Sequence, residues 1–407
     1  MNTFRMTGLL SLPKETEKFK PYLTKTSASG WNMDKLRFNV TCGDNRHMMS
    51  VDALYRADES NDITVFTKGG VDDNGNKIKG ESIKIKFKER LTDPRLVEVA
   101  EYRKLVVDTE VRGRRQALSR AFDNMKEGKM PSDEELQALG VTDKNEIASE
   151  IEKSKKKRKE FISEKDFLEH IKKVIESGKY KDKMFSISGN IVVELNKMNG
   201  QFYTKFQPNR VYLAGDDAAP MCEGEFKVYY GKDGLDALSV DETGKYYLNG
   251  YTLEYNQDTK KNDLAAPITL VLPAKVDGDN KWDKIAAKFV KYFTVNGEEY
   301  KEIGLKCNLL NGAQRKELDL DDLDEETREN IELGLITMDD VKRELNITST
   351  YGDRIQAYVI TSLMQGYSRG SVETTFVEED FQLKSAEGND IDIDNILDGN
   401  TDEDDDI

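Results

Sequence analysis

The chain has 407 residues, of which 37% are hydrophobic and 34% charged, and its formal net charge at pH 7 is −16. This length is enough for two or three domains. The sequence contains no run of 18 apolar residues, which a membrane-spanning helix would need, and its first residues lack the apolar core of a signal peptide. We therefore expect a cytoplasmic protein without membrane contacts.

The negative charge is concentrated at the C-terminal end. Residues 385–407 contain ten acidic residues and no basic ones. The rest of the chain has 61 basic and 67 acidic residues, a net charge of −6. The segment also has no hydrophobic periodicity, so it cannot form a core and should be disordered. The total charge argues only mildly against a nucleic-acid ligand, because the body of the chain is closer to neutral.

Cysteine and histidine are too rare for most metal sites. Cys42, Cys222 and Cys307 are far apart in the sequence, and neither a CxxC pair nor a Cys/His cluster occurs. We therefore expect no disulfide framework, no metal and no cofactor, and we interpret the cysteines as small buried hydrophobic residues. His47 follows a predicted turn and could touch a ligand, whereas His170 lies beside the apolar face of a predicted helix.

Three strands are predicted in the first 56 residues. They cover residues 4–12, 35–42 and 46–56, with a polar loop at 13–30 after the first. From Leu36 to Cys42, apolar and polar residues alternate, which is typical of a strand with one buried face.

A helix and a hairpin follow only from residue 165. Between Phe167 and Ile175, apolar residues recur at steps of three or four, which predicts an amphipathic helix that ends at Gly178. Strands are predicted at 184–195 and 201–214, with an Asn-Gly hairpin turn between them. Gly189 interrupts the apolar face of the first of these strands and indicates a bend or bulge.

Residues 57–164 are expected to form a basic insertion of mixed α/β character. Residues 82–88 alternate apolar residues with lysines, which predicts a half-buried strand with one cationic face. Two further basic groups follow, namely the cluster of Arg112, Arg114, Arg115 and Arg120, and the run at 153–159. A run of charge is usually a solvated helix face, but three basic groups in one insertion favour nucleic-acid binding.

The same order of elements recurs after a linker at 214–220. Strands are predicted at 225–230, 245–255, 267–273, 300–310 and 354–363, with an amphipathic helix at 280–293. An acidic helical insertion at 317–346 separates the last two strands. Gly304 interrupts its strand as Gly189 does in the first unit.

Three strands, a helix ending near Gly178, a strand carrying Gly189 and an Asn-Gly hairpin resemble an OB-fold. The resemblance is closest to single-stranded DNA-binding proteins, covers residues 1–56 and 165–213, and extends more loosely to 225–363. It implies a mainly β fold with helical insertions, built of two OB-type five-stranded barrels plus a disordered acidic tail. The implied domains are 1–214 with the insertion 57–164, 220–384 with the insertion 317–346, and the tail 385–407.

The end of the chain resembles the tails of bacterial and bacteriophage single-stranded DNA-binding proteins. It is an acidic run capped by an apolar residue, with the sequence Asp402, Glu403, Asp404, Asp405, Asp406 and Ile407. In that family the tail docks replication or recombination proteins and competes with DNA. The bacterial tail ends in an aromatic residue after a proline, whereas this chain ends in Ile407 without a nearby proline. The alternative is a solubilising tail without a partner.

No catalytic motif occurs. The sequence lacks the GxxxxGK[ST], GxSxG and HExxH patterns and has no GxGxxG after a strand. The acidic cluster at 319–324 has almost consecutive carboxylates, which are more often solvated than metal-binding. We therefore expect no catalytic residues and no enzymatic activity.

Aromatic residues interleaved with cations on predicted strands are the candidate binding site. Single-stranded DNA needs ring faces for its bases and cations along its backbone. Because side chains alternate, about half of these aromatics should face the core. The predicted nucleic-acid-binding residues are Trp31, Arg37, Arg46, Tyr55, Arg56, Lys84, Lys86, Tyr203, Lys205, Arg210, Tyr247 and Tyr251.

These patterns and the resemblance lead us to expect a sequence-tolerant single-stranded DNA-binding protein that protects DNA during replication or recombination. The resemblance further implies a bacteriophage protein in the host cytoplasm, with replication or recombination proteins docking on the tail. One alternative is a structural or virion assembly protein of β-domains without nucleic-acid binding. Another is an OB-containing accessory of an enzyme, which should show a cluster of carboxylates in a cleft.

Overall fold

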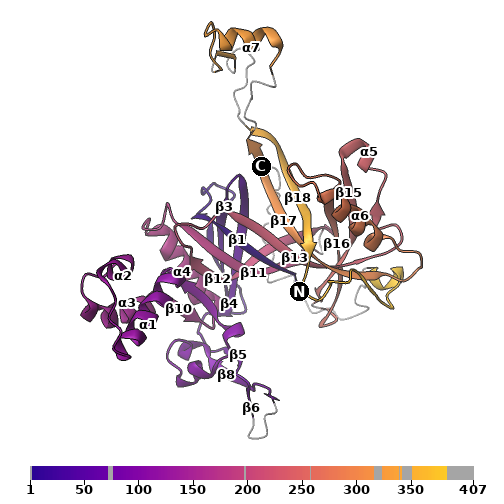
Figure 1. Ribbon diagram of the computed structural model, residues 1–407. Helices are drawn as coiled ribbons and strands as arrows, with labels where there is room; N and C mark the ends of the chain where they lie inside the picture. The colour runs from indigo at the N-terminus through magenta and orange to yellow at the C-terminus, as the bar shows by residue number, and fades with distance from the viewer. Residues whose placement is uncertain are drawn as a thin grey trace.

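The computed structural model describes residues 2–71, 77–196, 199–256, 258–315, 323–338, 340–341 and 351–382. It is mainly β, with a large mixed sheet and several helices, so the predicted fold class is confirmed in these terms. Two groups of long strands lie at the centre, with α1–α3 and the β5–β8 hairpin projecting from the first group (Figure 1). Within the described part of the chain, no helix is long and apolar enough to cross a membrane.

The first group is a closed ring of five strand pairings. Its strands are β1 (Asn2–Ser11), β3 (Trp31–Cys42), β4 (Asn45–Arg56), β11 (Met184–Leu195) and β12 (Phe202–Leu213). β1 pairs with β3 and β3 with β4, all antiparallel, while β4 pairs with β12 in parallel. β12 then pairs with β11, and β11 returns to β1. Helix α4 (Glu164–Glu176) comes between the third and fourth strands of the ring.

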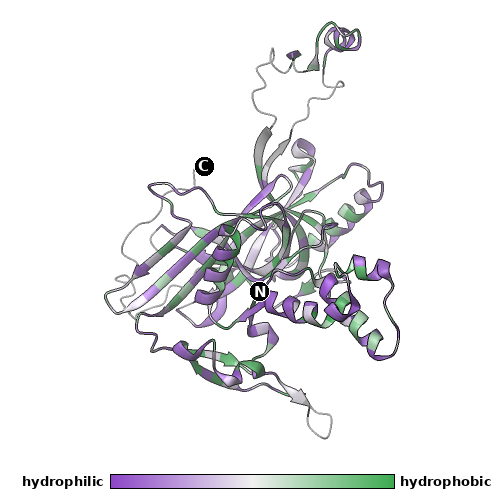
Figure 2. Ribbon diagram, turned by 90° about the vertical axis from the view of Figure 1, so that its left-hand side faces the viewer, coloured by the Kyte–Doolittle hydropathy of each residue, from purple (hydrophilic) through white to green (hydrophobic). Residues whose placement is uncertain are grey.

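Alternating apolar residues fill the inside of this ring. Leu36, Phe38 and Val40 of β3 are fully buried, as the period of two predicts. Helix α4 buries Phe167 and Ile171 against the same core, and Ser163 caps its first turn through its side chain. Each such side chain contributes about 1.5–3 kcal/mol by burial. Figure 2 shows the resulting alternation of hydrophilic and hydrophobic residues along the strands.

Gly189 allows a local irregularity between β11 and β12. The pairing register shifts between Ser188 and Gly189, so the predicted bulge is confirmed. A Cβ atom at residue 189 would lie 2.0 Å from the carbonyl oxygen of Gln207. Only glycine therefore permits the two backbones to approach this closely.

The second group of strands repeats the order of the first. Its strands are β13 (Met221–Tyr230), β15 (Lys245–Asn256), β16 (Lys261–Pro273), β17 (Lys301–Arg315) and β18 (Tyr351–Leu363), with helix α6 (Trp282–Phe293) between β16 and β17. β13 pairs with β15, β15 with β16, β16 in parallel with β18, β18 with β17, and β17 with β13. Both rings therefore have one parallel pair, between their third and fifth strands.

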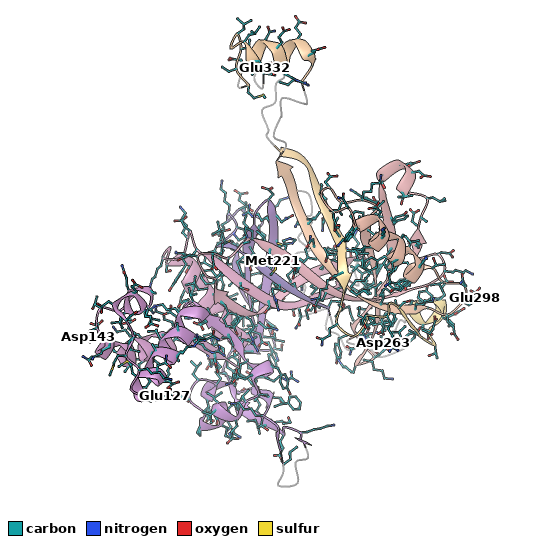
Figure 3. All side chains as sticks on the ribbon, in the orientation of Figure 1. Glu127, Asp143, Met221, Asp263, Glu298 and Glu332 are labelled. Atoms are coloured by element: carbon teal, nitrogen blue, oxygen red, sulfur yellow. The ribbon has the colours of Figure 1, made fainter. Side chains whose placement is uncertain are left out.

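The two rings are joined by strand pairing and share one core. β1 runs antiparallel to β13, with Thr3 opposite Glu225 and Thr7 opposite Met221, which Figure 3 labels at the centre of the molecule. Buried apolar residues of both rings form a single cluster. The side chain of Asn2 also donates to Glu254 at 2.9 Å across the junction. Residues 214–220, expected to be a linker, thus connect two fused units.

His47 lies in this junction, which corrects the expectation that it could touch a ligand. Its side chain is 2% exposed, and Nε2 donates to the carbonyl oxygen of Leu309 at 3.1 Å. Burial lowers the pKa of His47 to about 4. The residue is a neutral contact between β4 and β17.

The insertion after β4 adds strands and a small helical module. β9 pairs in parallel with β12, and β10 pairs with β9, so the sheet of the first ring continues into the insertion. Helices α1–α3 enclose their own cluster around Leu118 and Ile147. The elements are β5 (Asp62–Phe66), β6 (Gly70–Val71), β7 (Lys77–Ile78), β8 (Ser82–Lys86), η1 (Phe87–Glu89), η2 (Pro94–Glu98), η3 (Glu101–Arg103), β9 (Leu105–Asp108), α1 (Arg112–Lys126), α2 (Asp133–Ala138), η4 (Lys144–Glu146), α3 (Ile147–Lys157) and β10 (Arg158–Phe161).

The remaining elements are short and come before, between or after the ring strands along the chain. They are β2 (Tyr22–Thr26), β14 (Leu235–Asp236), α5 (Val240–Thr243), α7 (Glu325–Glu332), β19 (Val372–Glu373) and η6 (Glu378–Phe381). β2 pairs with the first half of β3 and extends the first ring into a long hairpin. The predicted acidic tail lies outside the described residues.

Candidate nucleic-acid interface

The outer face of β3 and β4 is an open surface of apolar and cationic side chains. Residues that alternate with the core positions meet in pairs across the two strands, including Trp31 with Arg56 and Met33 with Leu54. Leu54 is 61% exposed and Met48 44% exposed, although both are large apolar residues on regular strands. Met33 and Leu54 thus form a small apolar patch, and exposed apolar patches can mark a binding surface.

Four predicted residues lie on this face, at different points along the two strands. Trp31 and Arg37 project outward from β3, and Arg46 and Arg56 project outward from β4, because each alternates with buried neighbours. The guanidinium carbon of Arg56 lies 5.7 Å from the centre of the Trp31 ring. Such a cation–π pair holds a ring face and a positive charge next to each other.

Strand β12 extends the face with two more predicted residues. Lys205 Nζ lies 2.5 Å from Glu194 and 3.7 Å from Asp52 of the neighbouring β4. The hydroxyl group of Tyr203 bonds to Asn199 and Gln201 in the β11–β12 hairpin. The surface therefore runs from β3 across β4 to β12.

A group of cations lies in the middle of this surface. Burial lowers the pKa of Lys35, and the charges of Arg37 and Lys205 lower it further, while Asp52 and Glu194 oppose the effect. These side chains are thus close enough to act on one another electrostatically. A phosphate would be a favourable counter-ion for three neighbouring cations, since two carboxylates only partly neutralise them.

Tyr55 and Arg210 have structural roles, which corrects their expected contact with DNA. Tyr55 is 5% exposed, stacks on Phe87 with ring centres 5.1 Å apart, and donates to Asp34 at 2.9 Å. Alternation along β4 could have revealed this, because Tyr55 has the opposite parity to Arg56. Arg210 donates to the backbone carbonyl oxygens of Glu101 and Lys104, at 2.7 and 2.5 Å, and so fixes η3 against β12.

The arginine cluster of the insertion is also structural in part. Arg115 pairs with Asp108 at 2.5 Å, and Arg114 with Glu110 at 3.1 Å. Both carboxylates are buried at the base of the three-helix module. Two of the four clustered arginines thus neutralise buried acids, which sequence spacing could not indicate.

Lys84 and Lys86 lie outside the rings, on the β5–β8 hairpin. Both are exposed, as the alternating pattern predicts, and Ile83 and Ile85 face the opposite side. They therefore lie beyond the β3–β4 face, on the strand pair that follows β4.

The outer face of the second ring differs in charge from the first. Tyr247 and Tyr251 alternate with buried residues of β15 and face outward, but Tyr251 stacks on Phe381 with ring centres 5.1 Å apart. A cavity of about 700 Å³ lies beside it, and its lining includes the carboxylates Asp233, Glu298, Glu378 and Glu379. These acids disfavour a phosphate near Tyr251.

Sequence reasoning missed several residues of the first face. Met33, Lys35, Met48 and Leu54 have the same strand parity as the predicted residues and lie between them. Their parity was readable, but lone methionine and leucine residues on a strand are ordinarily assigned to the core.

The cysteine and histidine side chains are buried or half-buried. Among the residues that the structure describes, no group of three or more His, Cys, Asp or Glu side chains could hold a metal ion. All three cysteines are buried and unbridged, as the sequence predicts. His170 is half-buried beside Phe161, and burial lowers its pKa.

Comparisons with known proteins give little further information. No family model and no curated protein matches the sequence. Among solved structures, a deletion variant of the single-stranded DNA-binding protein from Thermus aquaticus is similar over 76% of this chain and 87% of its own, with 6% identity and a TM-score of 0.27. A score this low carries no argument about fold or function.

Proposed function

We propose that this protein is a non-enzymatic, sequence-tolerant single-stranded DNA-binding protein, and that the strand crosses the outer face of β3, β4 and β12. The observation that carries the proposal is the position of Trp31, Arg37, Arg46 and Arg56 on one face of β3 and β4, with Trp31 directly beside Arg56. A ring face can stack on any base for about 1–3 kcal/mol, and the cations neutralise phosphates without reading sequence.

The ring topology supports the same proposal. Each ring has five strands and a helix between its third and fourth strands, which is the order expected of an OB-type unit. In OB-folds the second and third strands, with the loops beside them, form the binding face. In the first ring these strands are β3 and β4. We accordingly treat residues 1–214 and 220–384 as two OB-type domains.

The cellular role is part of the proposal. Coating of exposed strands in bacteriophage replication or recombination suits sequence-tolerant binding, and the acidic tail suits docking of partner proteins in the same process. The tail can also compete with DNA for the cationic face, because its ten carboxylates resemble a run of phosphates in charge.

Fluorescence anisotropy with a labelled poly-dT oligonucleotide tests the proposal. Full-length protein and a chain ending at Leu383 are titrated across a salt series. We expect both to bind and the shorter chain to bind more tightly. For each phosphate contact, the binding constant should fall by about 0.7 log units per tenfold increase in salt. If neither binds at low salt, the proposal is refuted and the result favours the alternative of an assembly protein without nucleic-acid binding.

A further inference from the structure

The β5–β8 hairpin has an outer face of its own. Val65 and Ile85 point inward and pack against Val99 and Ile162. The residues that alternate with them point outward and pair across the hairpin as Asp62 with Lys86, Thr64 with Lys84, and Phe66 with Ser82. Two of these six outward residues are cations and one is a carboxylate.

An aromatic and cationic stack stands at the far end of this face. The guanidinium carbon of Arg103 lies 4.7 Å from the centre of the Phe66 ring and 5.4 Å from that of Tyr102. Tyr102 is 69% exposed, so most of its surface is open to solvent. The stack thus combines a free ring face with a fixed positive charge, which are the two groups that a nucleotide needs.

The backbone under the stack is held firmly. The amide of Ala100 donates to the carbonyl oxygen of Phe66 at 2.8 Å, and that of Lys68 donates to Glu98 at 2.7 Å. On the other side, Arg210 of β12 binds the carbonyl oxygen of Glu101. Because the backbone is already fixed, stacking of a base on Tyr102 requires ordering of its side chain alone.

The hairpin continues from the β3–β4 face. The backbone amide of Arg56 donates to the side chain of Asn61, directly before β5 begins. The inward-facing Tyr55 of β4 stacks on Phe87, which follows β8 on its inward side. These two contacts join the hairpin to the end of β4, so β5 begins close to Arg56 of the β3–β4 face. From Asp62 to Phe66 the path extends about 13 Å, at roughly 3.3 Å per residue.

We infer that Phe66, Arg103 and Tyr102 form a second base-stacking platform, which extends the bound single strand beyond Trp31 and Arg56. Lys84 and Lys86 contact the phosphates between the two platforms. The ligand is single-stranded DNA in both places, so the inference rests on the proposed function. It adds a prediction that the proposed function lacks: long strands use contacts that short strands cannot reach.

Binding of dT oligonucleotides of increasing length to the full chain tests the inference. In Tyr102→Ala we expect the affinity for long oligonucleotides to fall about five- to a hundredfold, the loss of one stacked base. Short oligonucleotides, which the β3–β4 face alone can hold, should bind as they do to the natural protein. Tyr102→Phe keeps the ring and is the matched control, with affinity expected within about twofold at every length.

The outcomes separate this inference from the proposed function. If the natural protein binds DNA but Tyr102→Ala binds every length equally well, the second platform is refuted and the first remains. If the natural protein binds no oligonucleotide, both are refuted. As an independent measurement, photocrosslinking of a long iododeoxyuridine oligonucleotide should label Tyr102. Crosslinks confined to the β3–β4 face would also overturn the inference.

Discussion

Glu194 pairs with Lys205 and partly neutralises its charge, so removing the Glu194 carboxylate should tighten DNA binding. Lys205 Nζ lies 2.5 Å from Glu194, and their side chains are 26% and 47% exposed. In Glu194→Gln the lysine keeps only the more distant Asp52, at 3.7 Å. We therefore expect Lys205 to become available for one more phosphate contact.

The size of the effect follows from counterion release. One additional phosphate contact to a single strand makes the negative slope of log K against log salt steeper by about 0.7. If the variant and the natural protein bind equally at 1 M salt, the variant should bind roughly fivefold more tightly at 0.1 M. The free energy of unfolding should fall by less than about 1 kcal/mol, because the pair is partly exposed. Anisotropy titrations in a salt series measure both the affinity and the slope.

Glu298→Gln is the matched control. It frees Lys232, which lies 3.1 Å from Glu298 on the second ring, and it makes the same change in net charge. We expect it to leave affinity and slope nearly unchanged. The reasoning is refuted if Glu194→Gln alters neither quantity, or if Glu298→Gln tightens binding as much, since net charge would then explain the effect.

Four further substitutions test the face and the fold. Trp31→Ala should weaken binding to oligo-dT by about 1–3 kcal/mol in anisotropy titrations. Tyr55→Phe should leave that affinity unchanged, but it should lower the free energy of unfolding in urea by about 1–3 kcal/mol, because the buried Asp34 loses its hydrogen-bond donor. Gly189→Val should lower the free energy of unfolding in urea by about 1–3 kcal/mol or more, because its side chain meets the Gln207 backbone; an unchanged free energy of unfolding contradicts the close approach. Burial lowers the pKa of His47 to about 4, so as the pH falls below about 6.5 the unfolded chain is protonated at this residue before the folded protein is. The contribution of His47 to the free energy of unfolding is therefore full above about pH 6.5 and falls by about 2 kcal/mol by pH 5. His47→Gln should lose that much less than the natural protein between pH 7 and 5, as measured by urea unfolding at both values.

Local patterns predicted most of the strands and helices. The period of two from Leu36 to Cys42 and the period of 3.6 in residues 165–177 match β3 and α4 closely, because both elements have one buried face. The bulge at Gly189 was readable for a similar reason, since glycine within a strand usually serves a close approach.

Long-range contacts were beyond such patterns. Nothing local indicates that β1 pairs with β13 or that His47 meets Leu309, because these contacts join residues more than 200 positions apart. Arg210 looked like a DNA ligand because its partners are backbone carbonyl oxygens, which carry no sequence signal. Tyr55, by contrast, could have been placed inward from its strand parity alone.

The pairing of β1 with β13 fixes the position of the second ring relative to the proposed DNA-binding face of the first ring. Modules on a flexible tether search for a strand independently and tolerate many spacings. Here the pairing of β1 with β13 and one common core join both rings, so the two rings move as one body. The acidic surface of the second ring therefore keeps one position relative to the proposed DNA path, and one molecule should cover a fixed number of nucleotides.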